Sequence, residues 1–341
     1  MVLPLRLETS WQRLRSAIHK CKYKCKQRLQ GTDQLQDNMG VRTATAALCH
    51  SGDVMRVVHW NVRRCNDLSG ACSRERVLKT LERLRPTLLT LNEVDLRQTP
   101  TLLEDLEEVV GLPHASFFGH VRGVYGNLLA SAVPLRSIEH THLEGGTQVR
   151  LGDGSVHRIA RGLLGASVTV LGTDVRIAVT HLDHMSSAER QTQMRHCLQA
   201  HDAAPTEQCL VVGDLNALRR ADYTAAQWEG HCSYNAERSW EAPADEAAPK
   251  GVLKQLQEAG FVDAFAVLER PPDWRAPPWS AHVGTDRPPY RIDYVWSRPP
   301  TAAFGRRLVP LSAAVELDSD DASDHQPVVV DFESIAFDAG E

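Results

Sequence analysis

Polar side chains of the kinds that phosphate chemistry uses follow several apolar segments of this sequence. Buried strands normally end in turn-forming residues, and a charged group at the end of an apolar run is rarely buried without a partner. Side chains that recur at strand ends predict a polar cleft on a rigid scaffold. The residues concerned are Asn61 after RVVHW, Glu93 after LLTLN, His181 and Asp183 after IAVT, Asp214 and Asn216 after LVVG, Asp293 within YRIDYV, and Asp324 and His325 in SDHQP.

Each of these residues alone has a structural explanation. Asn61 or Asp214 could cap a helix or form a side-chain turn, and a lone histidine such as His181 is more often a satisfied core or surface residue. Glu93 is harder to explain in this way, because it follows an apolar run directly. Six such groups at predicted strand ends would not be expected by chance, and together they favour an enzyme.

The residue types fit metal-assisted phosphoester hydrolysis. A hard cation such as Mg²⁺ binds oxygen ligands and keeps several waters, so one carboxylate and one amide oxygen are a typical protein share, which Glu93 and Asn61 could supply. Hydrolysis then needs a positioned water and charge neutralisation at the phosphoryl oxygens. Asp214 could orient or deprotonate the water, and Asn216 could donate a hydrogen bond to a phosphate oxygen.

Two histidines could handle protons or contact the phosphate. A histidine titrates near neutral pH and usually needs a carboxylate to fix its tautomer, so His325 could pair with Asp293. His181 could donate a second hydrogen bond to the phosphate. A zinc hydrolase is a weaker alternative, because the histidines form no convincing closely spaced ligand set.

These segments resemble the endonuclease/exonuclease/phosphatase superfamily, which has the deoxyribonuclease I-like fold. HWNV, LNEVD, YGNLLAS, THLD, GDLNAL, RIDYV and SDHQP occur in the order and approximate spacing of that superfamily, over about residues 54–333. The resemblance implies an α/β fold, a four-layer α/β/β/α sandwich with two mixed sheets and the site at one rim. It also implies Mg²⁺ or Mn²⁺ as cofactor and water as the direct nucleophile.

The resemblance also assigns roles to individual residues. It implies a metal site at Glu93 and Asn61 with Asp324 as a further ligand, catalytic roles for Asp214, Asn216, Asp293, His325 and His181, and phosphate contacts from Tyr125 and Asn127. The residue before the metal-binding glutamate is usually glutamine in the superfamily, and here it is Asn92. Asparagine keeps the side-chain amide on a shorter side chain, so we expect the metal site to be retained, with the amide reaching less far toward its neighbours.

Periodicity divides the chain into four parts. Residues 1–30 predict a basic amphipathic helix, residues 31–53 a linker, residues 54–333 the catalytic domain and residues 334–341 a tail. Within the domain, short β-type runs alternate with helical segments and predict about eight to ten strands. Two packed sheets flanked by helices fit this pattern better than a strictly alternating barrel.

The charge distribution is uneven. Residues 1–30 carry eight basic side chains and one acid, whereas the remaining 311 residues hold 30 basic and 42 acidic side chains. We expect the N-terminal helix to bind an anionic surface or to act in targeting. Eight cysteines without a CxxC pair and the lack of a secretory signal predict an intracellular protein, with the cytoplasm as the first expectation and an organelle or the nucleus as alternatives. No segment is long and apolar enough to span a membrane.

The sequence therefore predicts a divalent-metal-dependent phosphodiesterase or nuclease-type hydrolase. The alternatives are a phosphomonoesterase acting on a small or lipid-linked phosphate, and a non-catalytic scaffold with the same fold. The substrate would be a nucleic acid or a small or lipid phosphodiester, and the acidic body argues against a large DNA footprint. Aromatic residues before RIDYV could stack on bases or simply pack long loops; they are the tryptophans at positions 228, 240, 274 and 279.

Overall fold

The computed structural model describes residues 54–201, 204, 206–268, 279–282, 288–302 and 304–338. The predicted N-terminal helix and linker, residues 1–53, lie outside the described residues. Asp53–Glu341 forms one compact unit. Every helix within the described ranges is too short or too polar to cross a membrane.

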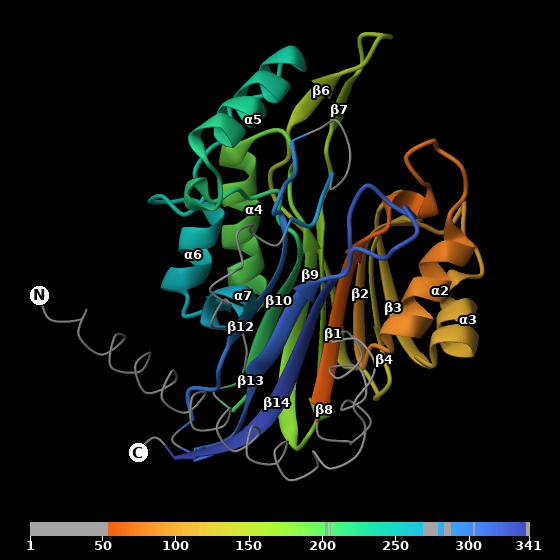
Figure 1. The fold of residues 1–341 in the computed structure, drawn as a ribbon, viewed down its shortest axis with the longest axis vertical. Helices are drawn as coiled ribbons and strands as arrows, with labels where there is room; N and C mark the ends of the chain where they lie inside the picture. The colour runs from red at the N-terminus through yellow and green to blue at the C-terminus, as the bar shows by residue number, and fades with distance from the viewer. Residues whose placement is uncertain are drawn as a thin grey trace, which may run out of the picture. The chain divides into compact units, whose positions relative to one another are not determined.

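Most described strands belong to two sheets (Figure 1). The first contains β1 (Val54–Asn61), β2 (Leu88–Asp95), β3 (His114–Val121), β4 (Tyr125–Ser131), β13 (Phe304–Val315) and β14 (Val328–Asp338). The second contains β5 (Arg136–His142), β8 (Gly162–Val170), β9 (Thr173–His181), β10 (Gln208–Asp214), β11 (Val262–Asp263) and β12 (Asp293–Arg298). A separate two-stranded ribbon consists of β6 (Gln148–Arg150) and β7 (Val156–Arg158).

Both sheets are mixed, as the sequence predicts. The strand order is β13-β14-β1-β2-β4-β3 in the first sheet and β11-β12-β10-β9-β8-β5 in the second. One neighbouring pair in each sheet is parallel, β1 with β2 and β9 with β10, and the other pairs are antiparallel. Because parallel neighbours end at the same edge, the last residues of these four strands can share one rim of the sandwich.

Helices cover the outer faces of the two sheets and complete the four layers (Figure 1). On the first sheet lie α2 (Arg74–Leu84), α3 (Leu102–Asp105) and the following π-turn η2 (Leu106–Val110). On the second lie α4 (Ser187–Ala200) and α6 (Val252–Glu258). The remaining helical segments are η1 (Arg63–Cys65), η3 (Arg220–Asp222), α5 (Ala225–Glu237) and α7 (Ala264–Val267).

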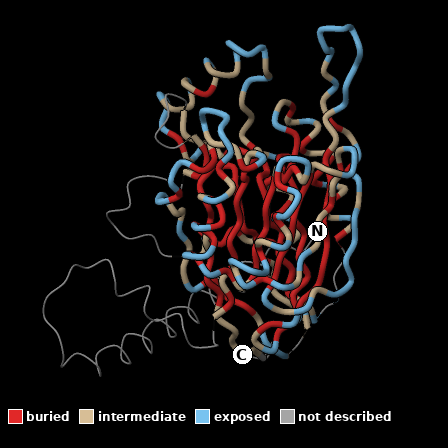
Figure 2. Tube along the Cα trace, turned by 90° about the vertical axis from the view of Figure 1, so that its right-hand side faces the viewer, coloured by how far each residue is buried: buried red, intermediate tan, exposed pale blue. Residues whose placement is uncertain are grey.

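The largest core lies between the two sheets, where alternate strand residues face inward. Val57 of β1 and Leu129 of β4 pack in the same cluster as Ile177 of β9 and Val212 of β10, and all four are fully buried. The burial trace shows this band of buried residues through the centre of the molecule (Figure 2). Burial of apolar surface stabilises the fold by about 25 cal/mol for each Å² and is the main force that holds the sheets together.

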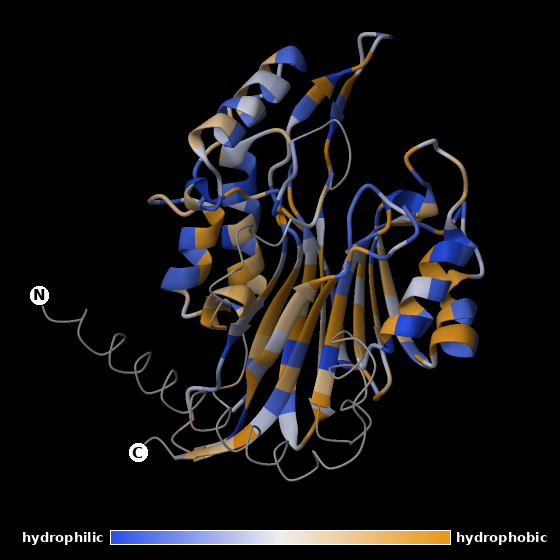
Figure 3. Ribbon diagram, in the orientation of Figure 1, coloured by the Kyte–Doolittle hydropathy of each residue, from blue (hydrophilic) through white to orange (hydrophobic). Residues whose placement is uncertain are grey.

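Two further cores attach the helices to the sheets. Val77 and Leu81 of α2 pack against the outer side chain of Val58, and Met194 of α4 packs in the cluster of Val211. Apolar residues of the strands and of the helices therefore form these cores, and the hydropathy colouring shows hydrophobic residues concentrated in the strands and in parts of the helices (Figure 3). This arrangement confirms the predicted α/β sandwich.

The structure differs from the sequence prediction at the C-terminus. Residues 334–338, which the sequence assigns to a tail, continue β14, and its backbone pairs with β13 as far as Asp338. The strands β3, β5 and β13 and the helix α5 are further elements that the sequence pattern does not single out. Several of these are exposed edge elements, which lack a strong apolar period.

Candidate active site

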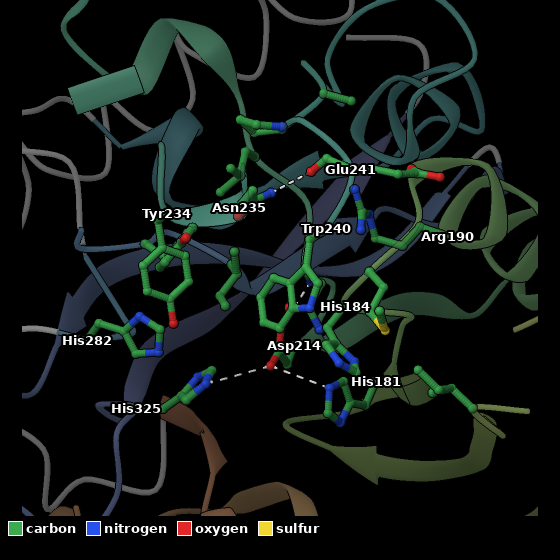
Figure 4. A pocket seen from close by; sticks show the side chains of 18 of the residues that line it. His181, His184, Arg190, Asp214, Tyr234, Asn235, Trp240, Glu241, His282 and His325 are labelled. Atoms are coloured by element: carbon green, nitrogen blue, oxygen red, sulfur yellow. Dashed lines mark hydrogen bonds and ion pairs between the residues drawn. The ribbon is translucent and has the colours of Figure 1, made fainter. Parts of the chain in front are cut away.

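A pocket of about 360 Å³ opens at the rim where the parallel strands end (Figure 4). Asn61 is the last residue of β1, His181 of β9 and Asp214 of β10. Asp293 is the first residue of β12, and the strand register places it beside Asp214, which in turn pairs with His181. The fold thus brings the predicted catalytic residues from distant segments into one row.

Local backbone geometry directs two of these side chains. Gly213 precedes Asp214, and a Cβ at this glycine would lie 1.8 Å from the carbonyl oxygen of Thr180, so only glycine allows β10 to approach β9 so closely. Glu93 has a left-handed backbone with φ of 57° at a bulge in β2. A bulge re-aims a side chain at the end of a strand, and here Glu93 lines the pocket.

Asp214 lies at the centre of the polar groups. Its Oδ2 accepts a hydrogen bond from Asn61 Nδ2 at 3.0 Å, and it lies 3.6 Å from His181 Nε2 and 3.8 Å from His325 Nε2. Burial and the nearby Asp293 carboxylate raise the pKa of Asp214. A carboxylate with a raised pKa is a better proton acceptor near neutral pH than an ordinary aspartate.

His325 and Asp293 form the predicted Asp–His pair. His325 Nδ1 lies 2.8 Å from Asp293 Oδ2, which also accepts a 2.7 Å hydrogen bond from the hydroxyl of Ser280. Burial opposes protonation of His325, but the carboxylates of Asp293, Asp214 and Asp324 raise its pKa. Burial would raise the pKa of Asp293, yet the His325 and His59 rings lower it. The 2.8 Å contact and these opposite pKa shifts favour an imidazolium at His325 paired with the Asp293 carboxylate.

His59 is a site residue that sequence reasoning missed. Its Nε2 lies 3.1 Å from Asp293 Oδ1, and its Nδ1 lies 2.9 Å from the hydroxyl of Thr90. The side chain is fully buried. His59 therefore fixes the second oxygen of the carboxylate that orients His325. Its only sequence signal is a titratable residue inside the apolar run RVVHW.

The predicted metal residues offer oxygen atoms to the pocket. Glu93 and Asp324 line it together with Asp214, and in the described residues Glu93 makes no ion pair with a basic side chain. Asn61 Nδ2 donates to Glu93 Oε1 at 3.1 Å, while its Oδ1 accepts from the Arg63 amide at 3.1 Å. Ligation by the Asn61 oxygen would thus require a rotation of the amide. An oxygen-rich set whose glutamate has no basic partner among the described residues fits a hard divalent cation.

Asp324 lies at the edge of this set. It is 3.8 Å from Arg63 Nε and 3.9 Å from His282 Nε2. A second group of atoms close enough to hold an ion consists of Asp214, Asp293 and His325, whose ligand atoms lie within 4.8 Å of one another. The hydrogen bonds of Asp293 to two histidines and a serine already occupy its carboxylate, so an acid–base role suits this group better.

The remaining predicted residues divide into two groups. Tyr125 and Asn216 line the pocket, and the Tyr125 hydroxyl lies close to Glu93, which together with burial raises its pKa. Asn216 Nδ2 donates to the Leu182 carbonyl at 3.2 Å. Asp183 is structural, because its carboxylate accepts hydrogen bonds from Thr147 and from the amides that precede α4.

Asn127, which the resemblance assigns to the phosphate, does not line the pocket. Its side chain is fully buried, and its Nδ2 donates to the Gly162 carbonyl at 2.8 Å, so it links the two sheets. Its Oδ1 accepts a 2.9 Å hydrogen bond from Asn92, whose own oxygen accepts the Asp214 amide at 2.8 Å. Asn127 and Asn92 therefore hold the end of β10 in place from behind the site.

Arg161 is a second missed residue. It lines the pocket, is only 6% exposed and forms no ion pair in the described part of the chain. One guanidinium nitrogen lies 3.3 Å from His184 Nδ1, and its Nε has no hydrogen-bond partner. A buried cation without a carboxylate partner is costly, and an anionic substrate would supply the missing partner.

Replacing Arg161 by methionine should lower kcat/KM for a phosphodiester by roughly 10- to 100-fold, because a charge-assisted hydrogen bond is lost. The thermal midpoint should stay level or rise, since an unpaired buried charge is removed. Steady-state kinetics and thermal unfolding measure both quantities. The exposed Arg158 provides the control as Arg158→Met. Unchanged kcat/KM in Arg161→Met would remove this residue from the site.

Comparisons with known proteins agree with the fold. The sequence profile described as "Endonuclease/Exonuclease/phosphatase family" matches residues 58–325. A search of curated protein sequences finds no significant match.

Solved structures with a similar fold share low sequence identity with this chain. An endonuclease/exonuclease/phosphatase from Beutenbergia cavernae DSM 12333 is 20% identical, with a TM-score of 0.59 and coverage of 82% of this chain and 72% of its own. TDP2 from D. rerio, complexed with single strand DNA product, is 20% identical, with a TM-score of 0.52 and coverage of 82% and 99%. An AP endonuclease from Archaeoglobus fulgidus is 17% identical, with a TM-score of 0.53 and coverage of 81% and 98%.

Proposed function

Because this chain belongs to the endonuclease/exonuclease/phosphatase family and is a phosphoester hydrolase, we propose that it cleaves phosphodiesters with a divalent cation and a water positioned by Asp214. The observation that carries this proposal is the arrangement around Asp214. A carboxylate whose pKa is raised lies between two histidines in a pocket that also exposes the Glu93 carboxylate.

Different residues of the pocket have different roles in the proposed hydrolysis. Asp214 orients the attacking water and accepts its proton, and the raised pKa suits that role. The positively charged His325, held by Asp293, stabilises the negative charge that develops on the phosphoryl oxygens. Burial and the Arg161 charge lower the pKa of His181, so its neutral ring can donate one hydrogen bond to the phosphate. Asn216 is positioned to donate another.

Glu93 and Asn61, with Asp324 beside them, are the residues that would hold a divalent cation. When bound, Mg²⁺ or Mn²⁺ would neutralise charge on the phosphoryl group and make a coordinated water more acidic. In addition to the charge of a bound metal ion, the Arg161 side chain places a positive charge on the pocket wall. The net charge of the residues after position 30 is negative, so local positive groups of this kind are needed to attract an anion.

Replacing Glu93 by glutamine should raise the metal concentration needed for half-maximal activity by about tenfold or more, because a neutral amide binds a hard cation less strongly. A Mg²⁺ titration of the initial rate measures this shift. The exposed Glu107 of η2 gives a matched control as Glu107→Gln. If the half-maximal concentration did not move in Glu93→Gln, Glu93 would not belong to the metal site.

A phosphomonoesterase acting on a small or lipid-linked phosphate is the second candidate, because the pocket is small enough to enclose a single phosphate group with one substituent. A non-catalytic scaffold would be expected to lack part of the catalytic set. Glu93, Asp214, Asp293 and His325 are all present.

Hydrolysis of bis-p-nitrophenyl phosphate and p-nitrophenyl phosphate with Mg²⁺, Mn²⁺ or EDTA tests the proposal. We expect cleavage of the diester that depends on the metal and stops with EDTA. Activity on the monoester alone would replace the proposal with a phosphatase. Diester cleavage that persisted in EDTA would contradict the role of the metal.

A further inference from the structure

The pocket has an aromatic side that the phosphoester chemistry does not use. Tyr234, Trp240 and Tyr290 line it together with Asp214 and His325, and the close-up labels Tyr234 and Trp240 among the side chains around the pocket (Figure 4). Tyr234 meets the other two rings edge to face, with centroid distances of 6.1 and 6.3 Å. A cleft that binds only phosphate would not need three large rings.

The other tryptophans of this region behave differently. Trp228 and Trp279 lie 5.9 and 5.0 Å from the ring of Tyr223 and pack in a small apolar cluster, and neither of them lines the pocket. Trp274 lies outside the described residues. Loop packing therefore explains two of the four tryptophans, while Trp240 is left with its side chain in the wall of the pocket.

Hydrogen bonds hold Trp240 in place before any ligand enters. Its backbone amide donates to the Asn235 carbonyl at 2.9 Å, and the Asn235 side chain donates to the Glu241 carbonyl at 2.7 Å. The Glu241 carboxylate accepts the backbone amide of Ser187 at the start of α4, at 3.0 Å. The end of α5 and the start of α4 therefore fix the loop from both sides. A preorganised ring binds a planar ligand at a lower entropic cost.

We propose that Trp240 forms the stacking face of a nucleobase subsite, with the near-perpendicular Tyr234 ring beside it, so that the phosphoester cleaved in this pocket belongs to a nucleotide; this inference rests on the proposed function. Bases stack on aromatic side chains because every base has a π-face. The base would lie against the aromatic side while its phosphate meets His181 and Arg161. Asn235 and Glu241 also line this side and offer polar groups to the edge of a base.

Two other ligand classes fit less well. A quaternary ammonium group also binds aromatic rings, but the Arg238 guanidinium already lies 3.5 Å from the centroid of the Tyr234 ring, and Arg161 adds a second positive charge to the pocket. A lipid would need room for acyl chains. The pocket measures about 360 Å³, near the lower end of the roughly 300–1,000 Å³ found for small-molecule sites.

Equilibrium binding to the full-length chain tests the subsite without turnover. Isothermal titration calorimetry with Mg²⁺ would compare the phosphonate analogues of adenosine 5′-phosphate and of ribose 5-phosphate, in which a methylene group replaces the bridging ester oxygen. We expect the adenosine compound to bind at least about tenfold more tightly, since the two ligands differ only by the base. Equal affinities would overturn the proposal, and so would tighter binding of the phosphonate analogue of phosphocholine.

Variants then assign the preference to the ring. Trp240→Ala should remove most of the difference between the two ligands, whereas Trp240→Phe should retain it because phenylalanine keeps a stacking face. Trp228→Phe in the same helix–loop region is the matched control and should bind both ligands as the parent does. If Trp240→Ala kept the full preference for the adenosine ligand, the base would bind elsewhere. The same conclusion would follow if Tyr234→Ala also kept this preference and the thermal midpoint of Trp240→Ala matched that of the parent.

The two proposals can fail separately. Metal-dependent diester cleavage without any preference for the adenosine ligand would leave the hydrolase function standing and remove the nucleobase subsite. A preference that depends on Trp240 in a protein that cleaves no diester would retain the subsite and remove the proposed reaction.

Discussion

Replacing Asp214 by asparagine is expected to lower kcat for diester hydrolysis by at least about 10³-fold, because the amide cannot accept a proton from the attacking water. The fold should persist. In the parent, Asp214 Oδ2 accepts from Asn61 Nδ2 and its Oδ1 accepts from the Asn216 amide, both at 3.0 Å, and the single asparagine oxygen can still accept one of these two hydrogen bonds. Steady-state kinetics with a phosphodiester measure the loss. Asp174→Asn, at an exposed position of β9, is the control.

The same variant should reveal a pH-dependent difference in stability. Burial and Asp293 raise the pKa of Asp214 in the folded protein above its value in the unfolded chain. Below about pH 4, where the carboxyl group is protonated in both states, the parent keeps its full stability. As the pH rises toward the folded-state pKa, the parent loses stability that Asp214→Asn does not lose. Thermal midpoints at pH 5 and pH 8 should therefore favour the variant more at pH 8.

A kcat of Asp214→Asn within about threefold of the parent would show that Asp214 does not handle the water. A stability difference that shrinks as the pH rises would contradict the buried, raised-pKa carboxylate. These two readouts are independent, so an inactive variant that has merely unfolded cannot be taken as support.

Replacing His325 by glutamine is the second large effect, and we expect kcat to fall by about 10³-fold or more because the positive charge beside the phosphoryl group is lost. Unlike the aspartate variant, this one should also be less stable at neutral pH. His325 lies 2.8 Å from Asp293 and 3.8 Å from Asp214, so its removal leaves two buried carboxylates without the cation between them.

Kinetics and urea unfolding at pH 7.5 would measure the effects of His325→Gln. His140→Gln, at an exposed position of β5, is the matched control. The destabilisation should shrink at lower pH, where one of the two carboxylates takes up a proton. Wild-type rates in His325→Gln would exclude the Asp–His pair from the reaction, and an unchanged unfolding midpoint would contradict the charge on His325.

The sequence predicts the centre of the fold well because of how the central strands are buried. The strands β1, β2, β9 and β10 are covered on both faces, so their sequences are nearly continuous apolar runs that end abruptly in polar residues. Where such runs end, Asn61, Glu93, His181 and Asp214 meet in the structure at one rim.

The sequence does not predict contacts that depend on which way a side chain faces. Asn127 occurs in a motif typical of the family, yet its amide faces the opposite sheet, where it bonds Gly162. His59 and Arg161 enter the site only because distant strands pack against each other, and nothing local distinguishes them. Trp240 likewise becomes part of the pocket through the folding of a long loop onto α4 and α5.

The most direct test of the central claim is the rate at which the parent and Asp214→Asn hydrolyse bis-p-nitrophenyl phosphate at pH 7.5, after EDTA treatment and again after Mg²⁺ is restored. We expect Mg²⁺ to restore cleavage in the parent, and we expect Asp214→Asn to stay at least about 10³-fold slower while remaining folded. Equal, metal-restored rates in the two proteins would contradict it.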